Sequence, residues 1–236
     1  MSGFVIAIDG PSAAGKSSTA HAVAQRLGFA HLDSGSIYRG VTLVGLRETG
    51  RRGFAPGNPL DVLDAETLLR AAEDRGLMLQ PDGSGFATYL EGEPADAAIR
   101  AAEVTARVSA VSAEPVVREW VNTHLRALVR AGRDVVVDGR DIGTVVFPDA
   151  PLKIFLTASA EARASRRISQ RGAGIDAAAL VREAAALAAR DHADSTRDVA
   201  PLRRAADAVD LDTTQLGFPE QVERIVMLAR AVLDRK

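Results

Sequence analysis

The sequence predicts an α/β fold, in which a mostly parallel sheet carries helices on both faces. Two observations lead to this class: short apolar runs alternate with long amphipathic stretches, and each strong polar motif follows directly after an apolar run. In an open parallel sheet, ligands bind at the carboxyl ends of the strands. The polar motifs therefore mark the place where a site is expected.

The pattern predicts five strands and several helices. The runs that predict strands are 4–8, 30–32, 135–137, 152–156 and 208–211, of which 30–32 is the weakest. The stretches that predict helices are 18–27, 36–47, 116–131, 160–170, 177–190 and 219–233. The alanine-rich tract within the fifth of these is expected to be helical because alanine is the strongest helix former.

One region departs from this alternation. Residues 77–80 and 87–90 are typical of two strands, and the turn residues of 81–85 separate them. A small β-containing insertion is therefore expected at about residues 60–100. The chain is otherwise predicted to be a single domain, with a lid at about 160–200 and a core at about 1–60, 101–160 and 200–236.

The composition is that of an ordinary globular chain. Of 236 residues, 47% are hydrophobic and 25% are charged, and the formal net charge of −2 removes any general attraction to nucleic acid or an anionic membrane. The lack of cysteine excludes disulfides, thiolate catalysis and cysteine-based zinc sites. The first strand begins within four residues, and no apolar run approaches the roughly 20 residues that span a bilayer. A cytoplasmic protein without a nucleic-acid or membrane partner is expected.

Residues 10–17 fit the phosphate-loop pattern G-x-x-x-x-G-K-[ST] between a predicted strand and a predicted helix. Glycines let successive backbone N–H groups and the helix N-terminus converge on phosphate oxygens. Lys16 would reach the terminal phosphates of a nucleotide, and the Ser17 hydroxyl would hold a Mg²⁺ ion that bridges them. The alternative is a simple turn rich in glycine and serine.

Two further clusters follow predicted strands. In 33–39, Ser34 and Gly35 can open a helix with Arg39 one turn along, which indicates a second anion site; a serine cap with a solvated arginine is the alternative. In 135–144, a buried strand ends in Asp138, Arg140 and Asp141. Buried charges at that point persist only when they are paired or bound, so Asp138 could orient Mg²⁺ or its waters. The alternative is a surface Arg–Asp pair.

The last two clusters lie in the predicted lid. Arg190, Asp194 and Arg197 have helical spacing and can share one face, although a solvated helix end looks the same. Arg163, Arg166, Arg167 and Arg171 precede glycines at 172 and 174, which suits a mobile lid over a nucleotide as well as an exposed basic helix. The four histidines show no metal-ligand spacing, so we expect them to be structural or exposed. They are His21, His31, His124 and His192.

Taken together, these stretches resemble the bacterial cytidylate (CMP/dCMP) kinases, within the nucleoside-monophosphate kinase family of P-loop proteins. The matching segments are 8–17, 32–39, 138–150, 153–156 and 199–202. The segments D-S-G-x-I-Y-R and D-G-R-D-x-G-T-V-V-F-P-x-A are specific, whereas the phosphate loop alone is not. The resemblance implies a parallel five-stranded P-loop sheet, ATP-dependent phosphorylation of CMP and dCMP, and Mg²⁺ bound with ATP. Small nucleotides are the implied partners, and a monomer is expected.

The resemblance also implies a role for individual residues. The set expected to bind ATP is Gly10, Pro11, Ser12, Ala13, Ala14, Gly15, Lys16, Ser17, Ser18, Arg163 and Arg167. The set expected to bind CMP is Ser34, Gly35, Arg39, Ser109, Arg118, Arg140, Asp141, Arg190, Asp194 and Arg197. The set expected to act in catalysis is Lys16, Asp138, Arg140 and Arg197.

Within the CMP set, the resemblance divides the ligand into parts. Ser34 and Arg39 would bind the acceptor phosphate with help from Arg118 and Arg140, and Arg197 would meet the phosphates in transit. The residues expected at the base are Ser109 and Asp141, and those at the ribose are Arg190 and Asp194. The positions that depart from the family pattern are Ser17, His192, Ala193 and Ser195.

Rival functions explain fewer of these motifs. A GTPase-like switch requires N-K-x-D, and the nearest string, 58–61, lacks the lysine. A non-catalytic ATP-binding module leaves the second anion site at 34–39 without a purpose. An adenylate or shikimate kinase is the nearest enzyme alternative, but the 33–39 segment and the hairpin insertion favour the cytidylate type.

Overall fold

The computed structural model describes residues 3–55, 57–130, 132–170, 172 and 176–235. Its centre is a parallel sheet whose strands have the order β2-β6-β1-β7-β8. Their bounds are Val5–Asp9 (β1), Ala30–Asp33 (β2), Val135–Gly139 (β6), Leu152–Thr157 (β7) and Val209–Asp212 (β8). The five strands expected from the sequence are confirmed, including the weak candidate at 30–32.

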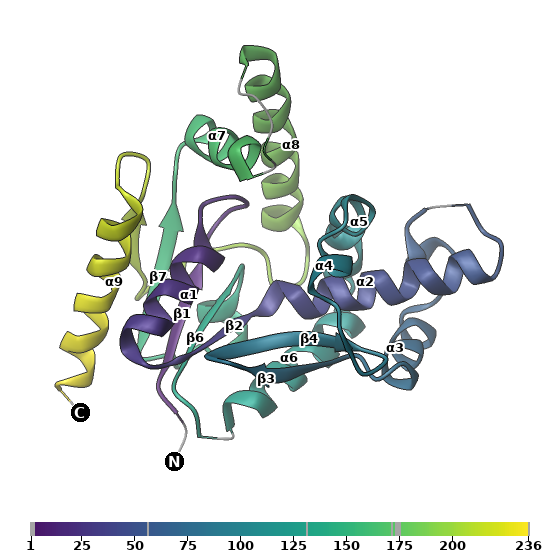
Figure 1. Ribbon diagram of the computed structural model, residues 1–236, viewed down its shortest axis with the longest axis horizontal. Coiled ribbons are helices and arrows are strands. Elements are labelled where there is room, and N and C mark those ends of the chain that lie inside the picture. Colours follow the sequence, from purple (N-terminus) through teal and green to yellow (C-terminus); the bar gives the residue numbers. More distant parts are fainter. Residues whose placement is uncertain (1–2, 56, 131, 171, 173–175, 236) are drawn as a thin grey trace.

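The insertion does not form a separate sheet. Its hairpin, β3 (Met78–Asp82) and β4 (Gly85–Leu90), joins the central sheet because β4 lies parallel to β2 with His31 opposite Gly85. The short β5 (Glu93–Pro94) pairs with β4. Within the described residues the sheet therefore has eight strands and is mixed, so the expected five parallel strands are only its core (Figure 1).

Helices cover both faces of the sheet, as predicted. Their bounds are Lys16–Leu27 (α1), Ser34–Arg51 (α2), Ala65–Asp74 (α3), Asp96–Ile99 (α4), Ala102–Ala113 (α5), Pro115–Arg130 (α6), Ala160–Gln170 (α7), Ala177–Thr196 (α8) and Phe218–Leu233 (α9). A 3₁₀ turn lies at Pro59–Asp61 (η1) and a π turn at Ile142–Val146 (η2). The helix predicted at 36–47 is longer at both ends, and the one predicted at 177–190 continues to Thr196.

Successive side chains of β1 and β6 point alternately into two apolar cores. Ile6 and Ile8 of β1 and Val136 of β6 face the core that contains α1 and α9. Val5 and Ala7, with both neighbours of Val136, face the core that contains α2, α3, α5 and α6. Because successive strand residues point to opposite faces, a strand that is buried on both sides needs an apolar side chain at every position.

One buried carboxylate connects two strand ends of the sheet. The two side-chain oxygens of Asp9, the last residue of β1, accept the backbone N–H groups of Ile142 and Gly143, at 2.8 and 2.7 Å. Burial raises the pKa of Asp9 to about 6 even though the two hydrogen bonds act to lower it. The turn that follows β6 is thereby held against the end of β1.

Helices α7 and α8, which lie within the predicted lid, run side by side above the carboxyl ends of the strands (Figure 1). The expected hinge glycine at 174 and the expected basic residue at 171 fall outside the described residues, and Gly172 has a φ of +68°. The division into core, insertion and lid stays a prediction. No helix in the described part of the chain is long and apolar enough to cross a membrane.

Helix α9 offers a matched pair of positions for testing the core. Ile225 is fully buried, whereas Met227 is 63% exposed. Ile225→Ala is expected to lower the free energy of unfolding by about 2–5 kcal/mol because it leaves a cavity under the sheet. Met227→Ala should change it by less than about 0.5 kcal/mol. Urea denaturation of both variants measures the difference, and equal values would contradict the packing described for α9.

Candidate active site

A cavity of about 700 Å³ opens above the carboxyl ends of β1, β2 and β6. Its walls come from the phosphate loop, the start of α2, α5, the residues after β6, and α8. The expected site residues that line it are Ser12, Ala13, Gly15, Lys16, Ser17, Ser18, Ser34, Gly35, Arg39, Ser109, Arg118, Asp138, Arg140, Asp141, Arg167, Arg190, Asp194 and Arg197. The expected residues outside the lining are Gly10, Pro11, Ala14 and Arg163.

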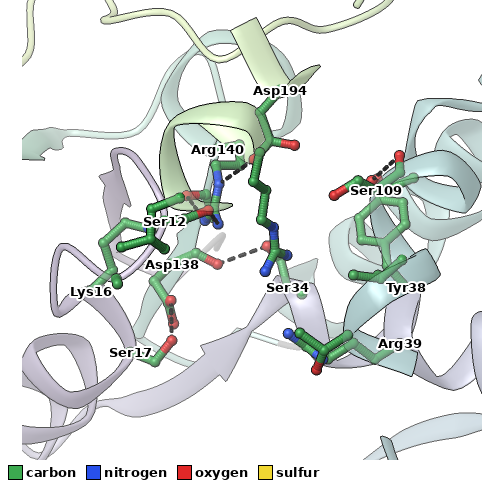
Figure 2. Close-up of a pocket in the computed structure, with 18 of the residues that line it drawn as sticks. Ser12, Lys16, Ser17, Ser34, Tyr38, Arg39, Ser109, Asp138, Arg140 and Asp194 are labelled. Atoms are coloured by element: carbon green, nitrogen blue, oxygen red, sulfur yellow. Dashed lines mark hydrogen bonds and ion pairs between the residues drawn. The ribbon is translucent and has the colours of Figure 1, made fainter. Parts of the chain in front are cut away.

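Figure 2 shows how these residues divide across the cavity. Ser12, Lys16 and Ser17 lie on one side, and Tyr38, Arg39 and Ser109 lie on the other. Ser34, Arg140 and Asp194 lie between the two groups, and Asp138 lies beside Ser17. The cavity therefore has two walls of different elements, with charged side chains in the space between them.

The phosphate loop has a backbone that requires its glycines. Gly10 has a φ of +149°, and a Cβ there would lie 2.0 Å from the carbonyl oxygen of Leu156. Gly15 caps α1 with a φ of +94°. Both conformations are strained for residues with a side chain, which is why the motif has glycine at these two places.

Lys16 is buried at the base of the loop. Its Nζ donates a hydrogen bond to the carbonyl oxygen of Pro11 at 2.7 Å. Burial, with the positive charge of Arg140 nearby, lowers the pKa of Lys16 to about 7, although Asp138 and Asp9 act in the other direction. A phosphate placed against Lys16 would supply the missing negative charge and favour the protonated amine.

Ser17, the last residue of the phosphate-loop motif, places its hydroxyl oxygen beside the carboxylate of Asp138. The Ser17 hydroxyl donates to Asp138 Oδ2 at 2.6 Å, and His31 Nε2 lies 2.8 Å from Asp138 Oδ1. Burial acts to raise the pKa of Asp138, but His31, Ser17 and Lys16 hold it below its usual range. The same contact raises the pKa of His31, against the effect of its own burial.

This pair fits magnesium but does not make a complete metal site. Hydroxyl and carboxylate oxygens are ligands that Mg²⁺ prefers, and it commonly takes only one or two of them from protein. No group of three or more histidine or acidic side chains that could hold a metal occurs in the described part of the chain. A Mg²⁺ ion at this point would therefore depend on nucleotide phosphates and water for its other ligands.

The opposite wall begins at the start of α2. Asp33 caps this helix by accepting the N–H of Gly35 at 2.9 Å, and Ser34 Oγ donates to the carbonyl oxygen of Asp138 at 2.7 Å. Arg39, one turn along, donates to Thr105 Oγ1 at 2.9 Å. Burial, and then the neighbouring Arg190, lowers the pKa of Arg39 to about 10. A crowded, partly desolvated guanidinium of this kind is stabilised by an anion.

A cluster of buried charged side chains also lines the cavity. Arg118 and Asp141 form an ion pair, and Arg197 Nη2 lies 3.5 Å from the other oxygen of Asp141. The Arg118 guanidinium stands over the ring of Tyr38, 5.4 Å from its centroid. Among the described residues that line the cavity, the buried side-chain atoms without a hydrogen-bond partner are Tyr38 Oη, Arg118 Nε, Arg190 Nε and Arg197 Nη2. Such atoms are expected where a polar ligand binds.

Ser12, in the phosphate loop, is hydrogen-bonded to side chains of α7, of α8 and of the segment after β6. Its N–H donates to Asp191 Oδ1 at 2.8 Å, its carbonyl accepts from Arg163 at 2.9 Å, and its hydroxyl accepts from Arg140 at 3.1 Å. Arg163 and Asp191 also form an ion pair, and Arg140 pairs with Asp194 at 2.9 Å. Arg163 thus lies behind the loop rather than in the cavity, and its expected contact with ATP stays a prediction.

Several cavity residues carried no assignment from the sequence. Tyr38 lies within the 33–39 motif, so the sequence could have indicated that it lines the site. Arg100 and Thr105 belong to no motif, and they reach the cavity because α4 and α5 fold back against α2. Arg100 pairs with Asp33 at 3.2 Å, and Thr105 holds Arg39. Only the fold brings these two side chains to the site.

Comparison with known proteins matches this chain to one family over nearly its whole length. The family model described as cytidylate kinase matches residues 6–231. A cytidylate kinase from Rhodococcus opacus is 43% identical over 230 residues, which cover 96% of this chain and 95% of the relative. Cytidylate kinases from Rhodococcus jostii and Geobacillus kaustophilus are each 44% identical and cover 94% or more of both chains. These matches show that the chain belongs to the cytidylate kinase family.

Proposed function

We propose that the protein transfers the terminal phosphoryl group of ATP to CMP or dCMP, giving ADP and CDP or dCDP. The observation that carries this proposal is that two segments suited to binding anions face each other across one cavity, with the phosphate loop on one wall and the start of α2 on the other. A binding module for a single nucleotide has no need of the second site. The names of the relatives supply the identity of the acceptor.

The reaction needs positioning and charge neutralisation rather than a general base. The nucleophile is an oxygen of the acceptor phosphate, which is largely ionised at pH 7 because the second pKa of a phosphate monoester is about 6. Two anionic nucleotides repel each other, so cations have to stand between donor and acceptor. Lys16, Arg140 and Arg197 line the cavity and are the groups we assign to this task. Arginine suits it because its planar fork binds two phosphate oxygens at once.

We assign the donor to the phosphate loop and the acceptor to the facing wall. Ser34, Gly35 and Arg39 would bind the acceptor phosphate, and Ser109 would meet the base together with the Arg118–Asp141 pair. The residues assigned to the ribose and to the nearby phosphates are Arg190, Asp194 and Arg197. Mg²⁺ bound to ATP would add positive charge at the transferring phosphates, with Ser17 and Asp138 as the protein groups that hold it.

The remaining expectations belong to the same proposal. Motion of the lid at about 160–200 would exclude water from the bound nucleotides and so limit hydrolysis of ATP. The near-neutral charge supports small nucleotides rather than nucleic acid as partners. We expect a monomer that works in the cytoplasm.

The first test is turnover of ATP·Mg²⁺ with AMP, CMP, dCMP, UMP and GMP, for the wild-type protein and for Lys16→Met. The substitution should lower turnover with CMP by about 10³-fold because it removes a fixed positive charge from the transferring phosphates. It should not lower the melting temperature at pH 7, because the folded protein loses only a buried and partly desolvated charge. Arg26→Ala, on the exposed face of α1, is the control. Normal turnover in Lys16→Met would contradict the assignment of Lys16.

Arg39→Ala tests the acceptor site. The KM for CMP should rise by about 10–100-fold because one charged hydrogen bond is worth roughly 1.5–3 kcal/mol. The KM for ATP should stay within about twofold, since Arg39 lies on the wall opposite the phosphate loop. Arg47→Ala, on the same helix but paired with Glu91 at the surface, is the matched control. An equal rise for both nucleotides would refute the two-wall assignment.

Ser109→Ala tests recognition of the base. The ratio of kcat/KM for CMP to that for UMP should fall by about tenfold if the Ser109 hydroxyl distinguishes the two bases. Ser112→Ala is the control on the same helix, because the Ser112 hydroxyl already donates to the Ser109 carbonyl at 3.1 Å. Steady-state kinetics with both acceptors measure the ratio. An unchanged ratio in Ser109→Ala would place base recognition elsewhere.

A further inference from the structure

His31 contacts the site although it does not line the cavity. It lies in β2, its side chain is 15% exposed, and its Nε2 is 2.8 Å from Oδ1 of the buried Asp138. An ionised carboxylate can only accept hydrogen bonds, and Asp138 already accepts one from the Ser17 hydroxyl on its other oxygen. Nε2 therefore carries the proton and donates it to the hydrogen bond. The sequence had indicated no role for this histidine.

The backbone of His31 is held from both sides. On one side it pairs with Val136 of β6, and on the other its N–H donates to the carbonyl oxygen of Ser84 at 3.1 Å. Gly85 lies opposite it in β4, where a Cβ would come within 2.9 Å of the His31 carbonyl oxygen. The imidazole thus projects from the place where the inserted hairpin joins the parallel sheet. A ring on so fixed a backbone can hold a neighbouring group in one orientation.

The contact leaves each oxygen of Asp138 with a separate donor. Oδ1 accepts from His31 and Oδ2 accepts from the Ser17 hydroxyl at 2.6 Å. The terminal torsion of an aspartate is broad, so a single hydrogen bond would let the carboxylate rotate. Two donors on opposite oxygens fix its plane and keep Oδ2 beside Ser17. A group that orients a metal-ligating carboxylate in this way commonly changes metal affinity or activity by 10–100-fold when it is replaced.

We propose that His31 is a positioning residue for phosphoryl transfer, which holds Asp138 so that its Oδ2 and the Ser17 hydroxyl together face the Mg²⁺ of bound ATP. This inference rests on the proposed function, in which Asp138 and Ser17 are the protein groups that hold Mg²⁺. His31 itself touches neither nucleotide, and it acts only through the carboxylate of Asp138.

Two amide substitutions separate this role from simple packing. In His31→Gln the side-chain amide can reach the place of Nε2 and donate to Asp138, whereas in His31→Asn it is one methylene too short. We expect kcat with CMP to stay within about threefold of wild type in His31→Gln and to fall by about 10–100-fold in His31→Asn. The KM for CMP should change by less than about twofold in both variants, because His31 lies outside the acceptor wall. His124→Gln, in α6 and outside the cavity lining, is the control.

A metal titration gives a readout that does not depend on turnover. Electron paramagnetic resonance measures free Mn²⁺ in a titration of the protein with a non-hydrolysable ATP analogue, and no acceptor nucleotide is present. The dissociation constant of Mn²⁺ should rise by about tenfold in His31→Asn and should be restored in His31→Gln. If CMP proves not to be the acceptor, the proposed function fails, while this titration still reports on His31.

Two results would overturn the role of His31. One is a His31→Asn protein with a lowered melting temperature but wild-type Mn²⁺ affinity and kcat, which is the signature of packing alone. The other is a His31→Gln protein as impaired as His31→Asn, since a restored donor should then restore function. If His31→Asn does not fold, His31→Phe keeps a ring of similar size without the donor, and the same two measurements decide.

Discussion

The buried carboxylate of Asp9 holds together the two strand ends on which the site is built. It accepts two backbone N–H groups from the turn after β6, while the phosphate loop begins at Gly10, directly after the end of β1. The loop that would bind the donor and the segment that carries Arg140 and Asp141 therefore have a fixed relation to each other. Loss of this carboxylate would leave two buried N–H groups without a partner and would free the turn. The geometry of the cavity follows from this contact.

The cavity above Asp9 holds more cationic groups than its own carboxylates neutralise. Asp138, Asp141 and Asp194 each pair with a neighbouring base. Burial nevertheless lowers the pKa of Arg190 and Arg197, with neighbouring arginines as the next cause. Bound phosphate groups would reduce this repulsion among the arginines, so the electrostatic energy of the site would be lower with a ligand than without one. The site is thus adapted to polyanionic ligands.

The parts of this structure that depend on local sequence could be predicted. The strands, the phosphate loop and the start of α2 follow from apolar runs, glycines and a capping aspartate that are neighbours in the chain. The pairing of Gly85 with His31 could not be predicted, because it joins segments more than fifty residues apart and neither segment has a sequence motif that indicates it. The same reason hides Arg100, Thr105 and the contact from His31 to Asp138. For Arg163, the sequence predicted that the residue lies in a helix. It did not predict that the side chain points toward the carbonyl oxygen of Ser12.

The three contacts of Ser12 have a consequence for the energetics of binding. Its amide, carbonyl and hydroxyl are each held by a side chain from a different part of the chain, so the loop has a defined shape with no nucleotide in it. Such preorganisation means that the conformational entropy of the loop has already been lost on folding and is not lost again when a ligand arrives. The amide already faces an anionic oxygen of Asp191. A phosphate that bound this amide would replace the Asp191 carboxylate as its hydrogen-bond acceptor.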